Sequence, residues 1–218
     1  MELDTVIKKR RSIRIFQDQP VEKKVIKLLI DAAIHAPSAC NIQGWKFIVV
    51  DDIKIKNKLV DFGGAQTIKK APLGILVLYD NRSKEIERMD YIQSAAAAIQ
   101  NLLLKATELG LGSCWICHLP TNKNLRKIFK VPDHFSPIAY ILLGYPQQAA
   151  KEVARKYSLD QIMNYNQFSA DWPSHKINKF NLMLNKILVK IYYLAPNLLK
   201  KRLLNKILDK KFVKKFDN

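Results

Sequence analysis

Residues 36–47 of this 218-residue chain read APSACNIQGWKF. A helical pattern of apolar residues stops before Pro37 and a β-branched run begins after Gly44, so the stretch predicts a polar loop between a helix and a strand. Ser, Asn and Gln side chains offer both donors and acceptors, which suits the recognition of a heterocycle. The alternative is an ordinary connection whose Trp45 belongs to the core.

Upstream of this loop, residues 8–14 (KKRRSIR) form a run of cations that is interrupted by one hydroxyl. Guanidinium groups bond phosphate oxygens in bidentate fashion and the Ser12 hydroxyl adds a neutral donor, so the run suits a phosphate dianion. Taken alone, the run is more typical of a solvated basic face than of a phosphate site.

The apolar periodicity predicts helices and strands in alternation. A short helix ends in the basic run, and a later helix begins at Thr121. The other helices are expected over 21–33, 53–62 and 91–109, and the strands over 46–50, 73–79, 113–117 and 138–143. This order predicts a mixed α/β or α+β layer fold. Four consecutive alanines, residues 95–98, would let another helix or a second subunit approach the longest helix closely.

Four motifs occur in a fixed order: basic-basic-Ser-x-basic at 10–14, A-P-S-x-x-N-x-Q-x-W-x-F at 36–47, G-L-G-S-C-W-I at 110–116 and L-G-Y-P at 143–146. In order and spacing they resemble the FMN-dependent nitroreductase superfamily, over roughly residues 1–163. The resemblance implies an α+β fold in which helices flank a central mixed or antiparallel sheet. It also implies a homodimer whose sites lie at the subunit interface.

Carried over residue by residue, the resemblance implies that Arg10, Arg11, Ser12 and Arg14 contact the FMN. Arg10 and Ser12 would face the phosphate, and Arg14 the N1/O2 edge of the ring, where a cation stabilises the anionic reduced flavin.

Three further groups of contacts come from the same resemblance. Pro37, Ser38 and Asn41 would reach the flavin of the partner subunit. The strand end at Ile116, Cys117 and His118 would offer a backbone N–H to flavin N5. Arg155 and Lys156 are the candidates for a basic pair that returns to the phosphate, although the residues before them depart from the family's proline-rich spacer. Gly44 also departs from the pattern, because proline is common at that position.

Residues 114–118 (CWICH) match the pattern of covalent haem attachment. That chemistry needs export, and the charged N-terminal residues contain no signal-peptide pattern. A redox dithiol needs its first Cys at a helix N-terminus, whereas Cys114 and Cys117 are expected on a strand. A zinc site would need Cys40 or His35 as a further ligand, and the sequence lacks the second pair of closely spaced ligands that is typical of such sites. We therefore predict no metal site, and interpret Cys114 and Cys117 as packing residues beside the flavin.

The charge of the chain is concentrated at its C-terminal end. The formal net charge is +18, and residues 175–218 contain twelve Lys and Arg against two Asp, which leaves +8 for residues 1–174. We therefore expect a nitroreductase-like domain over 1–170 and a basic amphipathic helical extension over 175–218, with helices over 177–194 and after Pro196. The extension could lie on an anionic membrane surface or pack on the other subunit. No nucleic-acid-binding motif is present.

These patterns predict a homodimeric enzyme that passes a hydride from NAD(P)H through FMN to a nitroaromatic, a quinone or a related acceptor. No stretch reaches the roughly 18 apolar residues of a spanning helix, so we expect a cytoplasmic protein that could associate with the membrane surface. The alternatives are a membrane-surface or partner-binding protein with a flavin fold, and a flavin-dependent dehalogenase or dehydrogenase. The residues do not distinguish NADH from NADPH.

Overall fold

The computed structural model describes residues 1–82, 87–116, 118–168, 183–184, 186–187, 191 and 194–195. The described residues divide into two compact units, one within Met1–Ala150 and one within Lys151–Ala195. The named helices and strands all lie within the first unit. The boundary between residues 170 and 175 that we expect from the sequence stays a prediction.

Four strands form a single sheet in the order β1-β2-β4-β3, and every neighbouring pair is antiparallel. The strands are β1 (Trp45–Val50), β2 (Leu73–Asp80), β3 (Gly112–Ile116) and β4 (Phe135–Gly144). Each one falls on a run that the sequence predicts as a strand. The expected α+β fold with a central antiparallel sheet is therefore confirmed.

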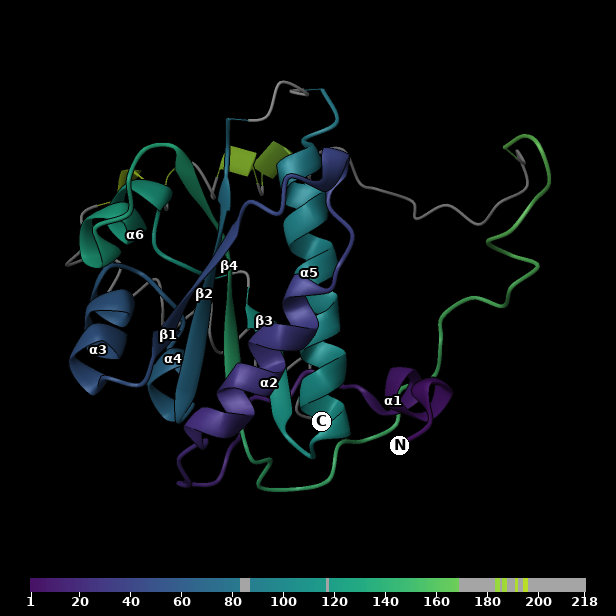
Figure 1. The fold of residues 1–218 in the computed structure, drawn as a ribbon, viewed down its shortest axis with the longest axis horizontal. Coiled ribbons are helices and arrows are strands. Elements are labelled where there is room, and N and C mark those ends of the chain that lie inside the picture. The colour runs from purple at the N-terminus through teal and green to yellow at the C-terminus, as the bar shows by residue number, and fades with distance from the viewer. Residues whose placement is uncertain are drawn as a thin grey trace. The chain divides into compact units, whose positions relative to one another are not determined.

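Helices cover both faces of this sheet (Figure 1). Helices α2 (Lys23–Ile34) and α5 (Asp90–Glu108) pack together on one face. The opposite face carries α3 (Ile53–Asp61), α4 (Thr67–Lys70) and α6 (Asn122–Phe129). The remaining elements are α1 (Leu3–Lys9), which contacts α5, and the 3-10 turn η1 (Ala39–Asn41). Short α4 and η1 are not expected from the sequence, because each spans about one helical turn.

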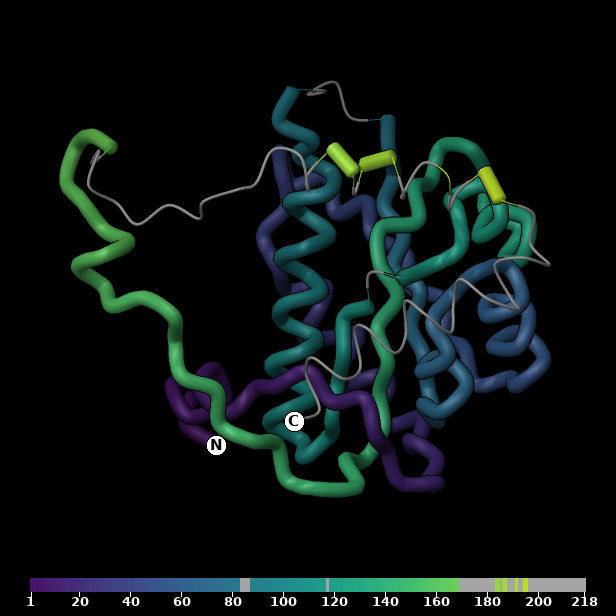
Figure 2. The backbone as a smooth tube through the Cα atoms, turned by 180° about the vertical axis from the view of Figure 1, so that it is seen from behind, coloured from purple at the N-terminus to yellow at the C-terminus, as the bar shows by residue number. Residues whose placement is uncertain are grey.

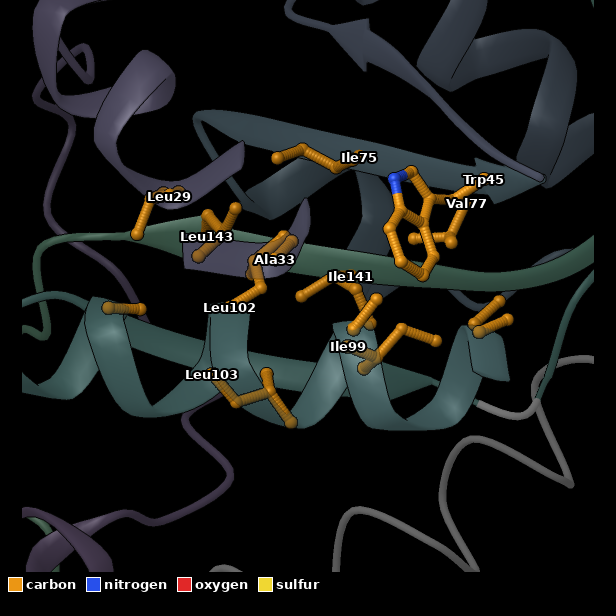
Figure 3. Close-up of a cluster of buried hydrophobic side chains, with 14 of the residues drawn as sticks. Leu29, Ala33, Trp45, Ile75, Val77, Ile99, Leu102, Leu103, Ile141 and Leu143 are labelled. Atoms are coloured by element: carbon orange, nitrogen blue, oxygen red, sulfur yellow. The ribbon is translucent and has the colours of Figure 1, made fainter. Parts of the chain in front are cut away.

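Strand β2 has no solvent-facing side, since every residue from Leu73 to Tyr79 is buried. Its side chains alternate between two cores: Ile75 and Val77 face the core under α2 and α5, whereas Leu76 and Leu78 face the core under α3, α4 and α6. This two-sided burial explains why β2 reads as an unbroken apolar run. Figure 3 shows the first core, where side chains of β2 and β4 meet those of α2 and α5.

Alanines of α5 lie in the core that this helix shares with α2. Ala95 and Ala98 are fully buried in the first core, which also contains Ala33 of α2. The first core therefore contains alanines from both helices, and the close approach expected from the alanine run stays a prediction.

Strands β2 and β4 also approach closely at Gly74. A Cβ at Gly74 would lie 2.0 Å from the hydroxyl oxygen of Tyr140, so only glycine fits beneath this ring. The Tyr140 hydroxyl is buried without a hydrogen-bond partner among the described residues, and its burial raises the pKa of the phenol. The packing of the second core therefore depends on a residue without a side chain.

The extension falls largely outside the described residues. At the end of its predicted first helix, the N–H of Ala195, one residue past the expected range, donates to the Ile191 carbonyl at 2.9 Å, a bond with α-helical spacing. The predicted second helix, after Pro196, lies outside the described residues. Within the part of the chain that is described, no helix has the length and apolar character needed to cross a membrane.

Lys56 is a buried cation in the first turns of α3. Its side chain is only 5% exposed, and its Nζ donates to the carbonyls of Ala71, at 2.9 Å, and Pro72, at 2.7 Å. Burial lowers the pKa of Lys56, and the negative charges of Asp51 and Asp52 oppose this shift. The side chain thus joins α3 to the junction between α4 and β2.

We expect Lys56→Met to lower the free energy of unfolding by about 2 kcal/mol, because the buried carbonyl of Ala71 and the partly buried carbonyl of Pro72 lose their donor. Urea denaturation measures this change, and Lys58→Met, an exposed position on the same helix, should alter it by less than about 0.5 kcal/mol. Because the pKa of Lys56 is lowered on folding, the unfolded state binds more protons just below pH 10.5, so wild-type stability should rise with pH there. Lys56→Met should weaken this rise. Equal stability of the two variants would contradict this role for Lys56.

Candidate active site

The basic segment at residues 10–14 is attached to the outer edge of β3. Ser12 forms a parallel bridge with Ser113, and the Ile13 N–H donates to the Ser113 carbonyl at 2.9 Å. A Cβ at Gly112 would lie 2.8 Å from the Cβ of Ile13, so the close approach of this segment requires glycine there. The segment then continues past the end of β4, where Phe16 bridges Pro146 (Figure 2).

The side chains of this segment differ in their surroundings. Ser12 is exposed, Arg10 and Arg14 are half-buried, and the Arg14 Nη1 lies 3.4 Å from the Ser12 carbonyl. Arg11 is directed to α1 instead, because its Nη1 donates to the carbonyls of Lys8, at 2.6 Å, and Arg10, at 2.8 Å. A cation at this position stabilises the C-terminal end of the helix. The contact between Arg11 and a flavin stays a prediction.

The polar loop before β1 has an unusual backbone. Cys40, Asn41 and Gln43 adopt left-handed conformations, with φ angles of 49°, 54° and 51°. The Ser38 hydroxyl oxygen accepts from the Gln43 N–H at 3.1 Å, and the Asn41 side-chain oxygen accepts from the Gln43 amide at 2.6 Å. Non-glycine residues in this region are strained and often lie at functional sites. Pro37 and Asn41 are exposed, and Ser38 is half-buried.

Ser94 anchors this loop and was not predicted as a functional residue. Its hydroxyl oxygen accepts from the Ala39 N–H at 3.0 Å, and its hydroxyl donates to the Asp90 carbonyl at 2.8 Å. The side chain is only 4% exposed. The sequence does carry one signal for a buried polar role. Ser94 lies four positions before Ala98, so it shares the buried face of α5 although its side chain is polar.

The chain leaves the sheet at the end of β3. Ile116 is buried and pairs with Tyr140 of β4, and the carbonyl of half-buried His118 accepts from the Ala65 N–H at 3.0 Å. Cys117 lies outside the described residues. The Cys114 side chain is buried in the second core, as expected for a packing residue. The described residues include no group of three or more His, Cys, Asp or Glu side chains that could hold a metal ion.

The predicted contacts therefore gather at opposite edges of the sheet. The basic segment lies beside Ser113 of the edge strand β3, and Ile116 lies three residues, or about 10 Å, further along the same strand. The loop with Ser38 and Asn41 precedes β1, which is the other edge strand. Two strands, β2 and β4, separate these edges, a distance of about 14 Å between strand axes.

Arg155 and Lys156 belong to the second unit of the chain. Both are exposed, and the Lys156 Nζ lies 5.1 Å from the centre of the Tyr157 ring. The return of this basic pair to a phosphate stays a prediction.

Comparison with known proteins gives a consistent result. The family model described as the nitroreductase family matches residues 7–63 and 60–145, which include three of the four motifs and most of the fourth. A provisionally named NADH dehydrogenase/NAD(P)H nitroreductase of Methanothermobacter thermautotrophicus is 37% identical over 153 residues, covering 68% of this chain and 79% of that protein.

Two solved structures are similar as well. An FMN-dependent nitroreductase of Clostridium difficile R20291 is 34% identical, with a TM-score of 0.64 over 75% of this chain and 98% of its own. A provisionally named nitroreductase of Desulfovibrio desulfuricans, solved in complex with FMN, is 27% identical, with a TM-score of 0.65 over 78% of this chain and 99% of its own. The shared sheet, the motifs on its edges and the extent of these matches show that the chain belongs to the nitroreductase family.

Proposed function

We propose that this chain is an FMN-dependent oxidoreductase that uses NAD(P)H to reduce a small acceptor, such as a nitroaromatic or a quinone. The supporting observation is the attachment of the basic segment to β3, through the bridge between Ser12 and Ser113. It brings cations suited to a phosphate next to the strand whose end, at Ile116, is expected to face the reactive ring.

The residues at this edge fit FMN in their chemistry. Arg10 and Ser12 offer a guanidinium and an exposed hydroxyl for the phosphate, and half-buried Arg14 offers a positive charge for the N1/O2 edge of the ring. When bound, FMN would supply hydride transfer through its N5 atom. The protein would bind, orient and electrostatically tune the cofactor, with no acid or base side chain at the centre of the chemistry.

A homodimer is part of this proposal. Within one chain, the loop with Ser38 and Asn41 precedes one edge strand and the basic segment pairs with the other, so a second copy could bring the loop to the flavin held by the first. Helix α1, next to the basic segment, exposes apolar side chains, with Leu3 67% and Ile7 47% exposed. Such residues are suited to burial against another subunit.

The names of the relatives support the choice of cofactor and co-substrate. One is named for NADH and NAD(P)H, one is named as FMN-dependent, and one was solved with FMN. The spectrum of the purified protein tests the proposal, followed by anaerobic titration with NADH and NADPH. We expect a flavin spectrum that is bleached by at least one nucleotide. A protein that stays colourless after incubation with FMN would refute the proposal.

Arg10→Ala and Arg14→Gln should have separable effects. Loss of a charged phosphate contact from Arg10 should raise the Kd for FMN about tenfold or more, since such a hydrogen bond contributes about 1.5–3 kcal/mol. Arg14→Gln should retain FMN but slow its reduction about tenfold, because the reduced ring loses its neighbouring cation. Fluorescence titration measures the first effect, and anaerobic stopped-flow absorbance the second.

The matched control for both is Lys9→Gln, which removes an exposed neighbouring cation that is not assigned to the site. It should leave FMN affinity and reduction within about twofold of wild type. Wild-type affinity and wild-type reduction in both arginine variants would show that the division of roles is wrong.

Ser94→Ala should loosen the loop that carries Asn41. The Ala39 N–H would lose its acceptor, and an unsatisfied buried group costs about 1–3 kcal/mol. Amide hydrogen exchange at residues 39–43 should become about tenfold faster, and FMN should dissociate more readily from the dimer. Gln100→Ala, an exposed change on the same helix, is the control. Unchanged exchange in Ser94→Ala would argue against this anchor.

A further inference from the structure

The two helical layers of the protein differ in charge. The layer formed by residues 51–72 and 121–134, which include α3, α4 and α6, contains nine Lys and Arg against four Asp, a net charge of +5. We call it the basic layer. The layer formed by residues 21–36 and 87–110, which include α2 and α5, contains five Lys and Arg against five Asp and Glu. We call it the neutral layer.

The charge of the basic layer is available to solvent. Its exposed lysines form no ion pair with any residue that the structure describes; they are Lys54, Lys58, Lys70, Lys123, Lys127 and Lys130. Within this layer, Arg126 pairs with exposed Asp133 at 3.8 Å. In the neutral layer, by comparison, Lys105 pairs with Glu108 at 2.6 Å. The basic layer therefore produces a positive potential with little internal compensation.

This layer begins at the end of β3 where the proposed site lies. Thr121, three residues after His118, caps α6, and its hydroxyl oxygen accepts from the Asn124 N–H at 3.3 Å. His118 itself is bonded to the loop between α3 and α4, because its carbonyl accepts from the Ala65 N–H. Helix α6 begins four residues after His118. An anion attracted to these helices would arrive next to the end of β3, which is expected to face the flavin ring.

We propose that the basic layer steers the pyridine nucleotide to the site and favours NADPH over NADH. This inference rests on the proposed function. Both nucleotides carry a pyrophosphate, and NADPH has one more phosphate, with a charge of about −1.5 to −2 at neutral pH. The additional charge strengthens attraction to the layer, so the difference between the nucleotides appears in the rate of association.

The attraction between the basic layer and the nucleotide depends on ionic strength, so the experiment compares low salt with high salt. The Debye length is about 30 Å at 0.01 M salt and about 3 Å at 1 M. The field of the layer therefore extends across the neighbouring site at low salt and is screened at high salt. In the wild-type protein loaded with FMN, the second-order rate constant for flavin reduction should favour NADPH at low salt, and this preference should shrink as salt rises.

Two triple variants with the same charge change test the location of the effect. Lys54→Glu/Lys123→Glu/Lys127→Glu alters the basic layer, and Lys23→Glu/Lys24→Glu/Lys27→Glu alters exposed positions on α2 in the neutral layer. Anaerobic stopped-flow reduction is measured with each nucleotide at 0.01 M and 1 M salt. At low salt, the basic-layer variant should lose about tenfold in rate with NADPH and less with NADH. At high salt, its rates should approach those of wild type.

At low salt, the neutral-layer variant should lose clearly less rate with NADPH than the basic-layer variant, and at high salt it should match wild type. Equal losses in the two variants, or the same salt dependence for NADPH and NADH, would overturn the proposal. The wild-type salt series tests the charge effect even if a variant fails to fold. A wild-type protein that binds FMN but is reduced by neither nucleotide would overturn both this inference and the proposed function. Reduction without a charge effect would overturn this inference alone.

Discussion

Burial of the central strands on both faces is the constraint on which the rest of the structure depends. Strand β2 has no exposed residue from Leu73 to Tyr79, and its backbone pairs with β1 on one side and β4 on the other. Apolar side chains on both faces need two helical layers to cover them. Once these layers are in place, ligands have no access to the centre of the sheet. The edge strands β1 and β3 remain as the places where polar groups can gather.

This constraint explains the arrangement of the proposed site. The basic segment adds to the edge of β3 through backbone bonds at Ser12 and Ile13, and so its charges remain at the surface. The strained loop lies before β1, at the other edge, and is fixed from beneath by Ser94. In a single chain, the basic segment and the strained loop are therefore attached to different edge strands. Under the proposed function, pairing of two chains brings the loop of one to the basic segment of the other, so that dimerisation and cofactor binding depend on each other.

The helical layers show how a fold can separate stability from electrostatics. Each layer buries an apolar face against the sheet, and the outward faces are free to differ in charge. Buried Lys56 illustrates the distinction, because its ammonium donates hydrogen bonds to two backbone carbonyls and so stabilises the fold. Exposed lysines of the same layer, such as Lys123, have no such bonds to described residues and act through their field. Identical residue types thus serve different purposes according to burial.

The sequence by itself determined where the strands and the principal helices lie, because apolar periodicity and caps such as Thr121 are local properties of the chain. Its motifs also identified the candidate contacts, including Arg10 and Asn41. Strand order and direction were decided by the tertiary structure, since alternating helices and strands fit a parallel sheet equally well. The anchoring role of Ser94 and the direction of Arg11 also emerged only there. Ser94 finds its partner 55 residues away, and Arg11 bonds carbonyls freed by the end of a helix. Such contacts depend on which segments meet in space, and residue spacing along the chain does not encode that information.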